Sequence, residues 1–356
     1  MLDDPAFGAL FWDRRELLKH LSAMPLDEKE VGALFDLIGK RDNIRIIDGS
    51  TRVVLEGAGF LLGTQIIASL RAGHSVIINN AETLSHVIRD LRCEIEWATR
   101  HPVEDCTMFV TPAERAPLRP HVDAEHIITV QISGAKQWTL AKRMPVRSTA
   151  QVRLAQEDRR TVTVSAGDIF YLPPGVPHVV RTLSTPSISL AFGIERISAE
   201  TVLQNALDTH IAAQIPEDFG FDWFDRGHDM RALVAEAFSG AALDAALSIA
   251  RGSAVRRMAN GSSVAGPWSQ RVGQDGWLER TSVPMHVYVE SDDAIVSIAG
   301  CPLKRYPLSS TATIQWIARR DEPFRIQDLS AIEGDPGAFA IIEYFVDCGA
   351  LRPIVP

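Results

Sequence analysis

Residues 167–178 read Gly-Asp-Ile-Phe-Tyr-Leu-Pro-Pro-Gly-Val-Pro-His, and this stretch decides the fold that we predict. Gly167 turns the chain, residues 168–172 form a short apolar strand, and residues 173–175 make a rigid Pro-Pro-Gly turn. The turn delivers His178 to the start of another strand with little conformational entropy left to lose. A lone histidine in such a place is most often a packed core residue, so its interpretation depends on partners elsewhere in the chain.

Two partners precede it in the sequence His121-Val122-Asp123. Side chains along a strand alternate with a period of two, so His121 and Asp123 point to the same face and can share one ion. By itself, a His-x-Asp sequence arises by chance on many protein surfaces. Together with residues 167–178 it favours a metal site, because two imidazoles and one carboxylate are the protein ligands of the facial iron(II) site.

Short strand-like segments continue on both sides of these residues. They are punctuated by Gly and Pro, and they include residues 75–79, 108–110, 127–132, 137–140, 161–164 and 187–192. Many short strands of this kind are typical of a sandwich or barrel, so we predict a mainly β catalytic core at residues 49–197. Within it, residues 127–132 and 137–140 are expected to form a hairpin around Ser133-Gly134-Ala135. Residues 82–98 have the apolar spacing of a helix.

The N-terminal segment, residues 1–48, has mainly helical spacing. Apolar residues recur at helical intervals over residues 7–21, and after the break at Pro25 the pattern continues over residues 27–37. We therefore predict a helical segment before the β core.

The pattern changes again after the β core. Residues 198–268 predict a helical linker, with helices at 199–215 and 230–250 and a Gly- and Ser-rich connector beginning at residue 253. Residues 269–356 mix strands and helices in the outline of a winged helix. The linker also carries a basic cluster, Arg251, Arg256 and Arg257, which we interpret as a solvated helix face, with RNA contact as the alternative.

The overall composition is that of an ordinary globular protein of 356 residues. Its formal net charge of -9 argues against a general affinity for nucleic acid and is compatible with a basic partner. The four cysteines are scattered, which predicts reduced thiols and a cytoplasmic location. The N-terminus lacks the pattern of a signal peptide and no apolar stretch is long enough for a membrane span, so we expect no membrane association.

Residues 167–178 match the second motif of the cupin superfamily at each of its fixed positions. The wider chain resembles the Jumonji-C (JmjC) oxygenases, and among them the bacterial and eukaryotic ribosomal-protein hydroxylases. The other segments that carry the resemblance are FWDRRELL (11–18), SVIINNAE (75–82), FVTP (109–112), HVD (121–123) and QISGAKQW (131–138). The likeness covers about residues 7–195 and implies a double-stranded β-helix. The helical linker and tail also resemble the dimerisation and C-terminal domains of this group, which implies a homodimer.

The resemblance implies a complete cofactor set. His121, Asp123 and His178 would hold Fe(II), with 2-oxoglutarate and O2 as cosubstrates. Lys136 lies fifteen residues after His121, where the basic residue of the family pairs with the far carboxylate of 2-oxoglutarate. A dianion inside a barrel needs such a cation, because an unpaired buried carboxylate is costly. The alternative for Lys136 is a solvated lysine on a hairpin.

The sequence departs from the family pattern at several positions. Thr107 and Phe109 stand where related enzymes often have Asn-x-Tyr, so one hydroxyl of the cosubstrate pocket is missing. The candidates to replace it are Thr107, Thr129, Ser187 and Ser189. His126 is a conceivable fourth ligand, but its odd spacing of three residues from Asp123 and five from His121 directs it to the other face of the strand. Glu125 is not at the position of a cupin glutamate ligand, which favours a three-ligand site.

Three functions remain open from the sequence. The first is an Fe(II)- and 2-oxoglutarate-dependent oxygenase that hydroxylates a protein or peptide side chain, with a ribosomal protein favoured by the resemblance. The second is a tailoring hydroxylase of a natural-product peptide or small molecule, which would use the same iron site. The third is a non-catalytic binding or regulatory protein. The intact His121, Asp123 and His178 set argues against that third function, and the mixed charges of residues 308–351 argue against a helix that reads DNA.

Overall fold

The computed structural model divides the chain into two compact units. The first comprises residues 1–99 and 103–196, and the second comprises residues 100–102 and 197–356. The structure describes residues 14–21, 39–40, 43–48, 51–53, 60–61, 63–154, 156, 158–197, 199–206, 240–258, 276–290, 292–326, 328 and 337–354.

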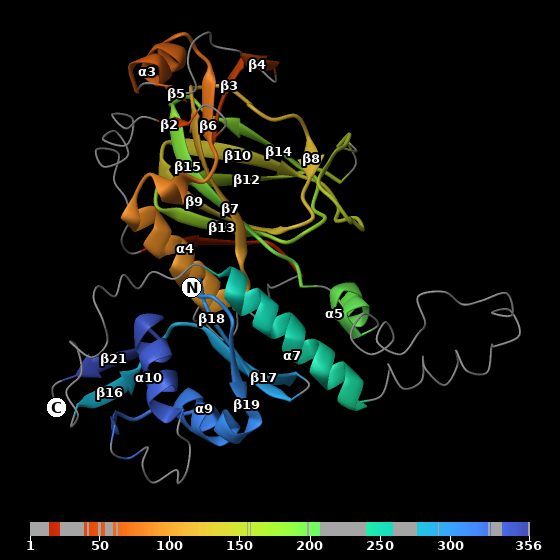
Figure 1. The fold of residues 1–356 in the computed structure, drawn as a ribbon. Helices are drawn as coiled ribbons and strands as arrows, with labels where there is room; N and C mark the ends of the chain where they lie inside the picture. The colour runs from red at the N-terminus through yellow and green to blue at the C-terminus, as the bar shows by residue number, and fades with distance from the viewer. Residues whose placement is uncertain are drawn as a thin grey trace, which may run out of the picture. The chain divides into compact units, whose positions relative to one another are not determined.

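The first unit is built on two antiparallel sheets (Figure 1). In spatial order the large sheet contains β1 (Leu17–His20), β13 (Asp168–Leu172), β9 (His126–Ser133), β15 (Ser187–Ile194), β7 (Val103–Thr111), β6 (Ser75–Ile78), β3 (Ile44–Asp48) and β4 (Thr51–Val53). The smaller sheet contains β11 (Ala150–Gln151), β8 (His121–Val122), β14 (His178–Thr182), β10 (Ala135–Leu140) and β12 (Arg160–Ser165). A separate pair joins β2 (Gly39–Lys40) to β5 (Phe60–Leu61). The prediction of a mainly β core is confirmed.

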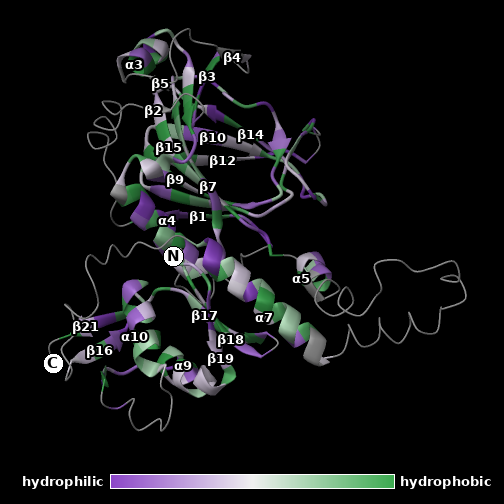
Figure 2. Cartoon of the chain, in the orientation of Figure 1, coloured by the Kyte–Doolittle hydropathy of each residue, from purple (hydrophilic) through white to green (hydrophobic). Residues whose placement is uncertain are grey.

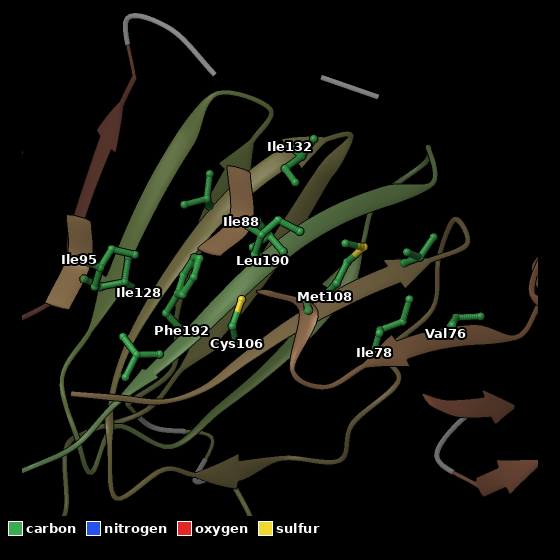
Figure 3. Packing of buried hydrophobic residues seen from close by; sticks show 14 of the residues in the cluster. Val76, Ile78, Ile88, Ile95, Cys106, Met108, Ile128, Ile132, Leu190 and Phe192 are labelled. Atoms are coloured by element: carbon green, nitrogen blue, oxygen red, sulfur yellow. The ribbon is translucent and has the colours of Figure 1, made fainter. Parts of the chain in front are cut away.

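One face of the large sheet packs against helix α4 (His86–Thr99), with α3 (Gly63–Arg71) and the short helix η2 (Ala81–Thr83) nearby in sequence. Figure 3 shows Ile88 and Ile95 of this helix among the strand residues Ile128, Leu190 and Phe192. All five side chains are fully buried. The alternation of apolar and polar residues in β7, β9 and β15 places the apolar set on this face and leaves the other set for the space between the sheets.

A second apolar cluster lies on the inner side of the barrel. It contains Trp138, Leu140, Val164, Phe170 and Leu172, which come from β10, β12 and β13. Because these residues belong to both sheets, their burial holds the sheets face to face. Figure 2 shows the mixture of hydrophobic and hydrophilic residues along the same strands.

The predicted hairpin between residues 127–132 and 137–140 is wrong. Both segments are strands, but β9 pairs with β13 and β15, whereas β10 pairs with β12 and β14. Gly134, with a φ of 66°, carries the chain from one sheet to the other, and a Cβ there would lie 2.1 Å from the Pro186 carbonyl oxygen. A two-sheet barrel therefore uses this turn as a corner, although its residues are those of a hairpin turn.

The helical prediction for residues 1–48 is wrong where the structure describes them. Leu17–His20 forms strand β1, which pairs with β13, and Ile44–Asp48 forms strand β3, which pairs with β6. Leu17 packs against the main apolar cluster, and Glu16 forms an ion pair with Arg160. Tertiary pairing at the edge of the sheet thus overrides the helical spacing. The predicted helix at 27–37 lies outside the described residues.

The second unit combines helices with two small antiparallel sheets. Strands β17 (Met285–Glu290), β18 (Asp293–Ile298) and β19 (Lys304–Pro307) form one sheet, and β20 (Phe324–Arg325), β16 (Trp277–Arg280) and β21 (Leu351–Ile354) form the other. The helices are α5 (Ala199–Ala206), α7 (Gly240–Arg257), η5 (Leu308–Ser310), α9 (Thr311–Ala318) and α10 (Ala338–Asp347). Helix α7 packs against α5, β17 and β18 (Figure 1).

Helix α7 corrects the predicted boundary of the linker. It continues to Arg257, so residues 253–257 are helical and do not begin a connector. The helix buries Ala246, Ala250 and Ala254, which repeat every four residues along one side. The predicted boundary at 268/269 lies outside the described residues, and the winged-helix assignment stays a prediction.

Two further features concern the chain as a whole. Among the described residues, no helix combines the length and apolar character that crossing a bilayer requires. None of the four cysteines forms a disulfide.

Candidate metal centre

The structure brings His121, Asp123 and His178 together. His121 Nε2 lies 3.7 Å from Asp123 Oδ1, and His178 Nε2 lies 3.6 Å from Asp123 Oδ2. In the described part of the chain this is the only group of three His, Cys, Asp or Glu residues whose ligand atoms all lie within 4.8 Å of one another. Neighbouring ligand atoms of an ion with bonds near 2.1 Å lie about 3 Å apart, so each histidine–aspartate distance would shorten by roughly 0.6–0.7 Å if an ion bound here.

Backbone contacts fix the chemical form of both imidazoles. His121 Nδ1 lies 2.9 Å from the Arg119 carbonyl oxygen, and His178 Nδ1 lies 3.0 Å from the Val176 carbonyl oxygen. A carbonyl oxygen only accepts hydrogen bonds, so each Nδ1 carries the proton and donates it. The lone pair of each ring is therefore on Nε2, the atom that faces Asp123, as a metal ligand requires.

Strand pairing and the Pro-Pro-Gly turn position these residues. His178 pairs with His121 across β14 and β8, and the Gly175 amide donates a hydrogen bond to the Asp123 carbonyl oxygen at 2.9 Å. Gly175 has a φ of 82°, and a Cβ there would lie 2.3 Å from the Met144 carbonyl oxygen, so only glycine fits. The indole of Trp138 stacks on the His178 ring with 5.3 Å between centroids, which restricts its rotation.

Burial sets the electrostatics of the group. Burial raises the pKa of Asp123, and the nearby Asp105 raises it further, while His121 and a hydrogen bond from Thr149 lower it. Burial, together with His121, lowers the pKa of His178 to about 3. His178 is thus a neutral imidazole at physiological pH, the form that binds a metal ion.

A cavity of about 540 Å³ opens from this group into the barrel. Its walls come from alternate residues of adjacent strands, because the side chains that point inward are every second residue. In the large sheet the inward rows, in register across β7, β15 and β9, are Asp105–Gly193–Ile127, Thr107–Ala191–Thr129 and Phe109–Ser189–Gln131. All but Gln131 line the cavity.

The smaller sheet supplies the opposite wall and gives the cavity two ends. His178 pairs with Leu140, Val180 with Trp138, and Thr182 with Lys136 across β14 and β10. His178 and Thr182 are four residues apart on one strand, or about 13 Å. The metal group therefore lies at one end of the cavity and Lys136 at the other.

Lys136 is the buried cation of this cavity. Its side chain is almost fully buried, its Nζ donates a hydrogen bond to Ser189 Oγ at 2.7 Å, and it lies 5.1 Å from the centroid of the Phe109 ring. Burial lowers its pKa to about 7. The alternative of a solvated lysine is wrong, because the turn before Lys136 is a corner of the barrel and the side chain points inward.

Three buried polar atoms of residues that line the cavity have no hydrogen-bond partner. They are Thr129 Oγ1, Thr182 Oγ1 and Trp138 Nε1. Unpartnered buried groups are costly, so they point to a bound group that would satisfy them. We did not predict Thr182 from the sequence. Only the register of β10 and β14, which places it opposite Lys136, identifies it.

The other predicted cosubstrate contacts lie in different surroundings. Thr107 lines the cavity, but its hydroxyl donates to Asp105 Oδ2 at 3.0 Å. Ser189 lines the cavity beside Lys136. Ser187 does not line it, since its hydroxyl accepts a hydrogen bond from the buried Gln131 amide at 2.9 Å.

The two residues that were weighed as extra ligands do not join the metal group. His126 is buried beside Tyr171, with 2.9 Å between His126 Nδ1 and the Tyr171 hydroxyl. Glu125 lines the cavity, and burial, with help from Asp105 and Glu104, raises its pKa to about 7. The site therefore has three protein ligands among the described residues.

These residues fit an octahedral ion that is chelated by a dianion. Three ligand atoms from one side leave positions free on the other, which faces the cavity. A carboxylate at the far end would gain the charge of Lys136 and a hydrogen bond from Thr182, the unpartnered hydroxyl that pairs across the strands with this lysine.

Comparisons with known proteins agree with this geometry. Residues 86–202, which include every residue of the metal group, match the sequence model of the JmjC domain. This segment of the chain is thus similar to JmjC domains. The resemblance that its motifs suggest is therefore confirmed, together with the cupin-like β core.

The bifunctional lysine-specific demethylase and histidyl-hydroxylase NO66 of Dictyostelium discoideum is 27% identical over 135 residues, which cover 36% of this chain and 26% of that protein. The chain thus spans about a quarter of the length of this curated relative.

Solved structures resemble the JmjC domain and the rest of the chain together. The X-ray structure of Escherichia coli ycfD is 15% identical, with 98% of each chain covered and a TM-score of 0.55. YcfD described as a ribosomal oxygenase, in complex with cobalt and 2-oxoglutarate, is 15% identical, with 99% of this chain and 98% of that chain covered and a TM-score of 0.57. At this identity the likeness shows a shared fold.

Proposed function

We propose that this protein is an iron(II)- and 2-oxoglutarate-dependent oxygenase that hydroxylates a side chain of a protein, with a ribosomal protein as its substrate. One observation carries the proposal: a three-ligand metal group and an uncompensated buried lysine occupy the two ends of one cavity. The match to the JmjC domain and the relatives described above support the same activity.

Different residues of the cavity would bind the iron and the cosubstrate. His121, Asp123 and His178 would hold the iron through two Nε2 atoms and a carboxylate. Iron(II) with 2-oxoglutarate supplies the activation of O2, in which the cosubstrate is converted to succinate and CO2 as a C–H bond is hydroxylated.

The far end of the cavity would select the cosubstrate. Lys136 would pair with its distal carboxylate, and Thr129 and Thr182 would donate hydrogen bonds to the same group. The apolar side chains of Val180 and Ala191 lie between the two ends and keep water from that part of the cavity. Trp138 keeps the His178 ring in the orientation that the metal needs.

Two carboxyl groups near Asp123 support a basic substrate side chain, while Arg45 and Arg119 also line the cavity. Asp105 and Glu125 line the cavity near Asp123, and both carboxyl groups face the Cα of Gly193. Oxidation of a C–H bond close to these groups favours a side chain that carries positive charge, and ribosomal proteins are rich in such residues. NO66 is described as a histidyl-hydroxylase and YcfD as a ribosomal oxygenase, which agrees with this class.

Mass spectrometry of ribosomal proteins tests the proposal. Host ribosomal proteins are compared with and without this gene, and after complementation with wild type or with His178→Ala. We expect one ribosomal protein to gain the mass of one oxygen atom only with wild type. If no ribosomal protein differs, while the purified enzyme forms succinate in the presence of another peptide, the substrate is of the natural-product class.

Three further proposals accompany this function. We propose a homodimer, a winged-helix C-terminal domain at residues 269–356 and a cytoplasmic location with reduced thiols. Sedimentation analysis of the full chain tests the first of these, with a mass of two chains as the expected result.

A further inference from the structure

The second unit contains a cavity of about 530 Å³ that has no part in the chemistry above. Its lining comes from helices α5 and α7, from the end of β16, from the start of β17 and from residues 100–101, all of which belong to the second unit. Figure 1 shows α7 lying along β17 and β18. The lining residues are of only two kinds, apolar and basic.

The basic residues converge from separate elements. Arg251 comes from α7, Arg280 ends β16, His286 lies in β17, and Arg100 comes from the first segment of the unit. None of the three arginines forms an ion pair with a described residue, and no carboxylate lines the cavity among the described residues. Three guanidinium groups therefore share one cavity without an ion pair, and the nearby charge of Asp321, which acts on Arg280, lies outside the lining.

Two of these side chains also lack hydrogen bonds at buried atoms. Arg280 Nε and His286 Nε2 are buried and have no partner. The opposite side of the His286 ring is occupied, because it hydrogen-bonds to the backbone of Ser248. Arg280 Nε is therefore a buried donor without an acceptor, which is costly, and an oxyanion in the cavity would accept a hydrogen bond from it.

The arrangement of the guanidinium groups indicates which class of anion would bind in the cavity. A guanidinium presents parallel N–H donors that match the oxygens of a phosphate, and several of them around one cavity match a group with more than one negative charge. A phosphate monoester has about two charges and three acceptor oxygens. The remaining lining, which includes Leu247, Ala254 and Met285, is apolar and fits an uncharged organic body. The volume is that of a site for a small molecule.

We propose that this cavity binds a phosphorylated small molecule of about the size of a mononucleotide, with the phosphate on Arg251 and Arg280. The site is independent of the proposed oxygenase function, since the two cavities share no residue. The three arginines of the basic cluster in the linker therefore have different surroundings. Arg251 lines the cavity, whereas Arg256 and Arg257 do not and remain on the exposed face of α7.

Calorimetric titration of the full chain tests the proposal. The probes are AMP, inorganic phosphate and adenosine, each at the same ionic strength. We expect AMP to bind more tightly than phosphate, and adenosine to bind weakly or not at all. We expect Arg251→Gln to weaken AMP binding about tenfold or more, because one charge-assisted contact is lost. Arg256→Gln, on the same helix but outside the cavity, should leave binding unchanged.

Two further variants keep the outcome decisive. Arg251 is exposed, so its substitution leaves the core intact. Arg280→Lys keeps the charge but loses the planar donor pair, and it should bind AMP less tightly than wild type. Equal binding of AMP by wild type, Arg251→Gln and Arg280→Lys would overturn the proposal, as would the absence of binding to wild type. Asp123→Ala should bind AMP like wild type, so failure of this site and failure of the oxygenase function are distinguishable.

Discussion

The two cavities have nearly the same volume, about 540 Å³ in the first unit and 530 Å³ in the second, but opposite charge arrangements. The first brings carboxylates and imidazoles to one end and a single lysine to the other. The second has guanidinium and imidazole groups and, among its described lining residues, no carboxylate. Volume therefore says little about what each cavity binds. The separation of charge suits the first to a metal ion with a dianion, and the excess of one sign suits the second to an anion alone.

The cavities also differ in how their residues are positioned. In the first, each side chain occupies a fixed register in paired strands, so its neighbours follow from the ladder. In the second, long arginine side chains extend from a helix and from a strand end, and no ladder relates them. We therefore expect single substitutions to reduce ligand binding or activity strongly at the first site and more weakly at the second.

Loss of a metal ligand should give the largest effect. It should abolish the activity of the first cavity and leave ligand binding in the second cavity unchanged. His178→Ala or Asp123→Ala removes one of three ligands, so we expect succinate formation to fall by about three orders of magnitude or more. Succinate is measured with a saturating substrate peptide. AMP binding and the circular dichroism spectrum should stay as in wild type, and residual turnover above a few per cent would contradict the assignment.

Lys136 should have the next largest effect. Removing one partner of a buried ion pair costs about 3–5 kcal/mol, so Lys136→Met should weaken 2-oxoglutarate binding about a hundredfold or more. Binding is measured anaerobically with Co(II) in place of iron. Without cosubstrate the same variant should be as stable as wild type or more stable, since a lone buried cation is removed. A variant that loses stability in the absence of ligand would show that Lys136 is mainly structural.

The pH dependence of binding should show a smaller and graded effect. Burial lowers the pKa of Lys136 to about 7 in the empty cavity, whereas the bound dianion needs the ammonium form. Above pH 7 the apparent Kd for 2-oxoglutarate should therefore rise by up to about tenfold per pH unit, with uptake of one proton. Titrations between pH 6.5 and about 8.5 in buffers of different ionisation enthalpy measure both quantities.

A matched variant isolates the lysine in that experiment. Lys136→Arg stays charged over the whole range, so its Kd should be nearly independent of pH. The empty wild type supplies a second readout. Unfolded Lys136 titrates near pH 10.5, so between pH 7 and 10.5 the unfolded chain binds a proton that the folded chain has released. The free energy of unfolding should rise with pH in this window, and Lys136→Met should lack that increment.

The unpartnered hydroxyl groups should give the smallest effect. Thr182→Val keeps the shape of the side chain and removes one hydrogen bond to a carboxylate, so we expect about tenfold weaker binding of 2-oxoglutarate. Thr161→Val, on strand β12 of the same sheet and outside the cavity, is the control and should not change binding. Equal affinity of Thr182→Val and wild type would remove Thr182 from the cosubstrate site.

Local sequence was sufficient where one strand or one turn fixes the geometry. The period of two in His121 and Asp123, and the turn before His178, bring the three side chains together as predicted. It failed where pairing partners decide the structure. Leu17–His20 has helical spacing but completes the edge of a sheet, and Ser133-Gly134-Ala135 has hairpin residues but connects two different sheets.

The sequence by itself therefore indicated the metal group and the β-rich core from side-chain period and turn residues, and the resemblance to a family pointed to Lys136, whose burial came from the tertiary structure. Only the tertiary structure decided that Thr182 faces Lys136, that Ser187 is turned away from the cavity, and that Arg251 and Arg280 meet in a second one. These are relations between segments far apart in sequence. They follow from strand register and from helix packing on a sheet, which are set by the burial of the whole unit and leave no local pattern in any one segment.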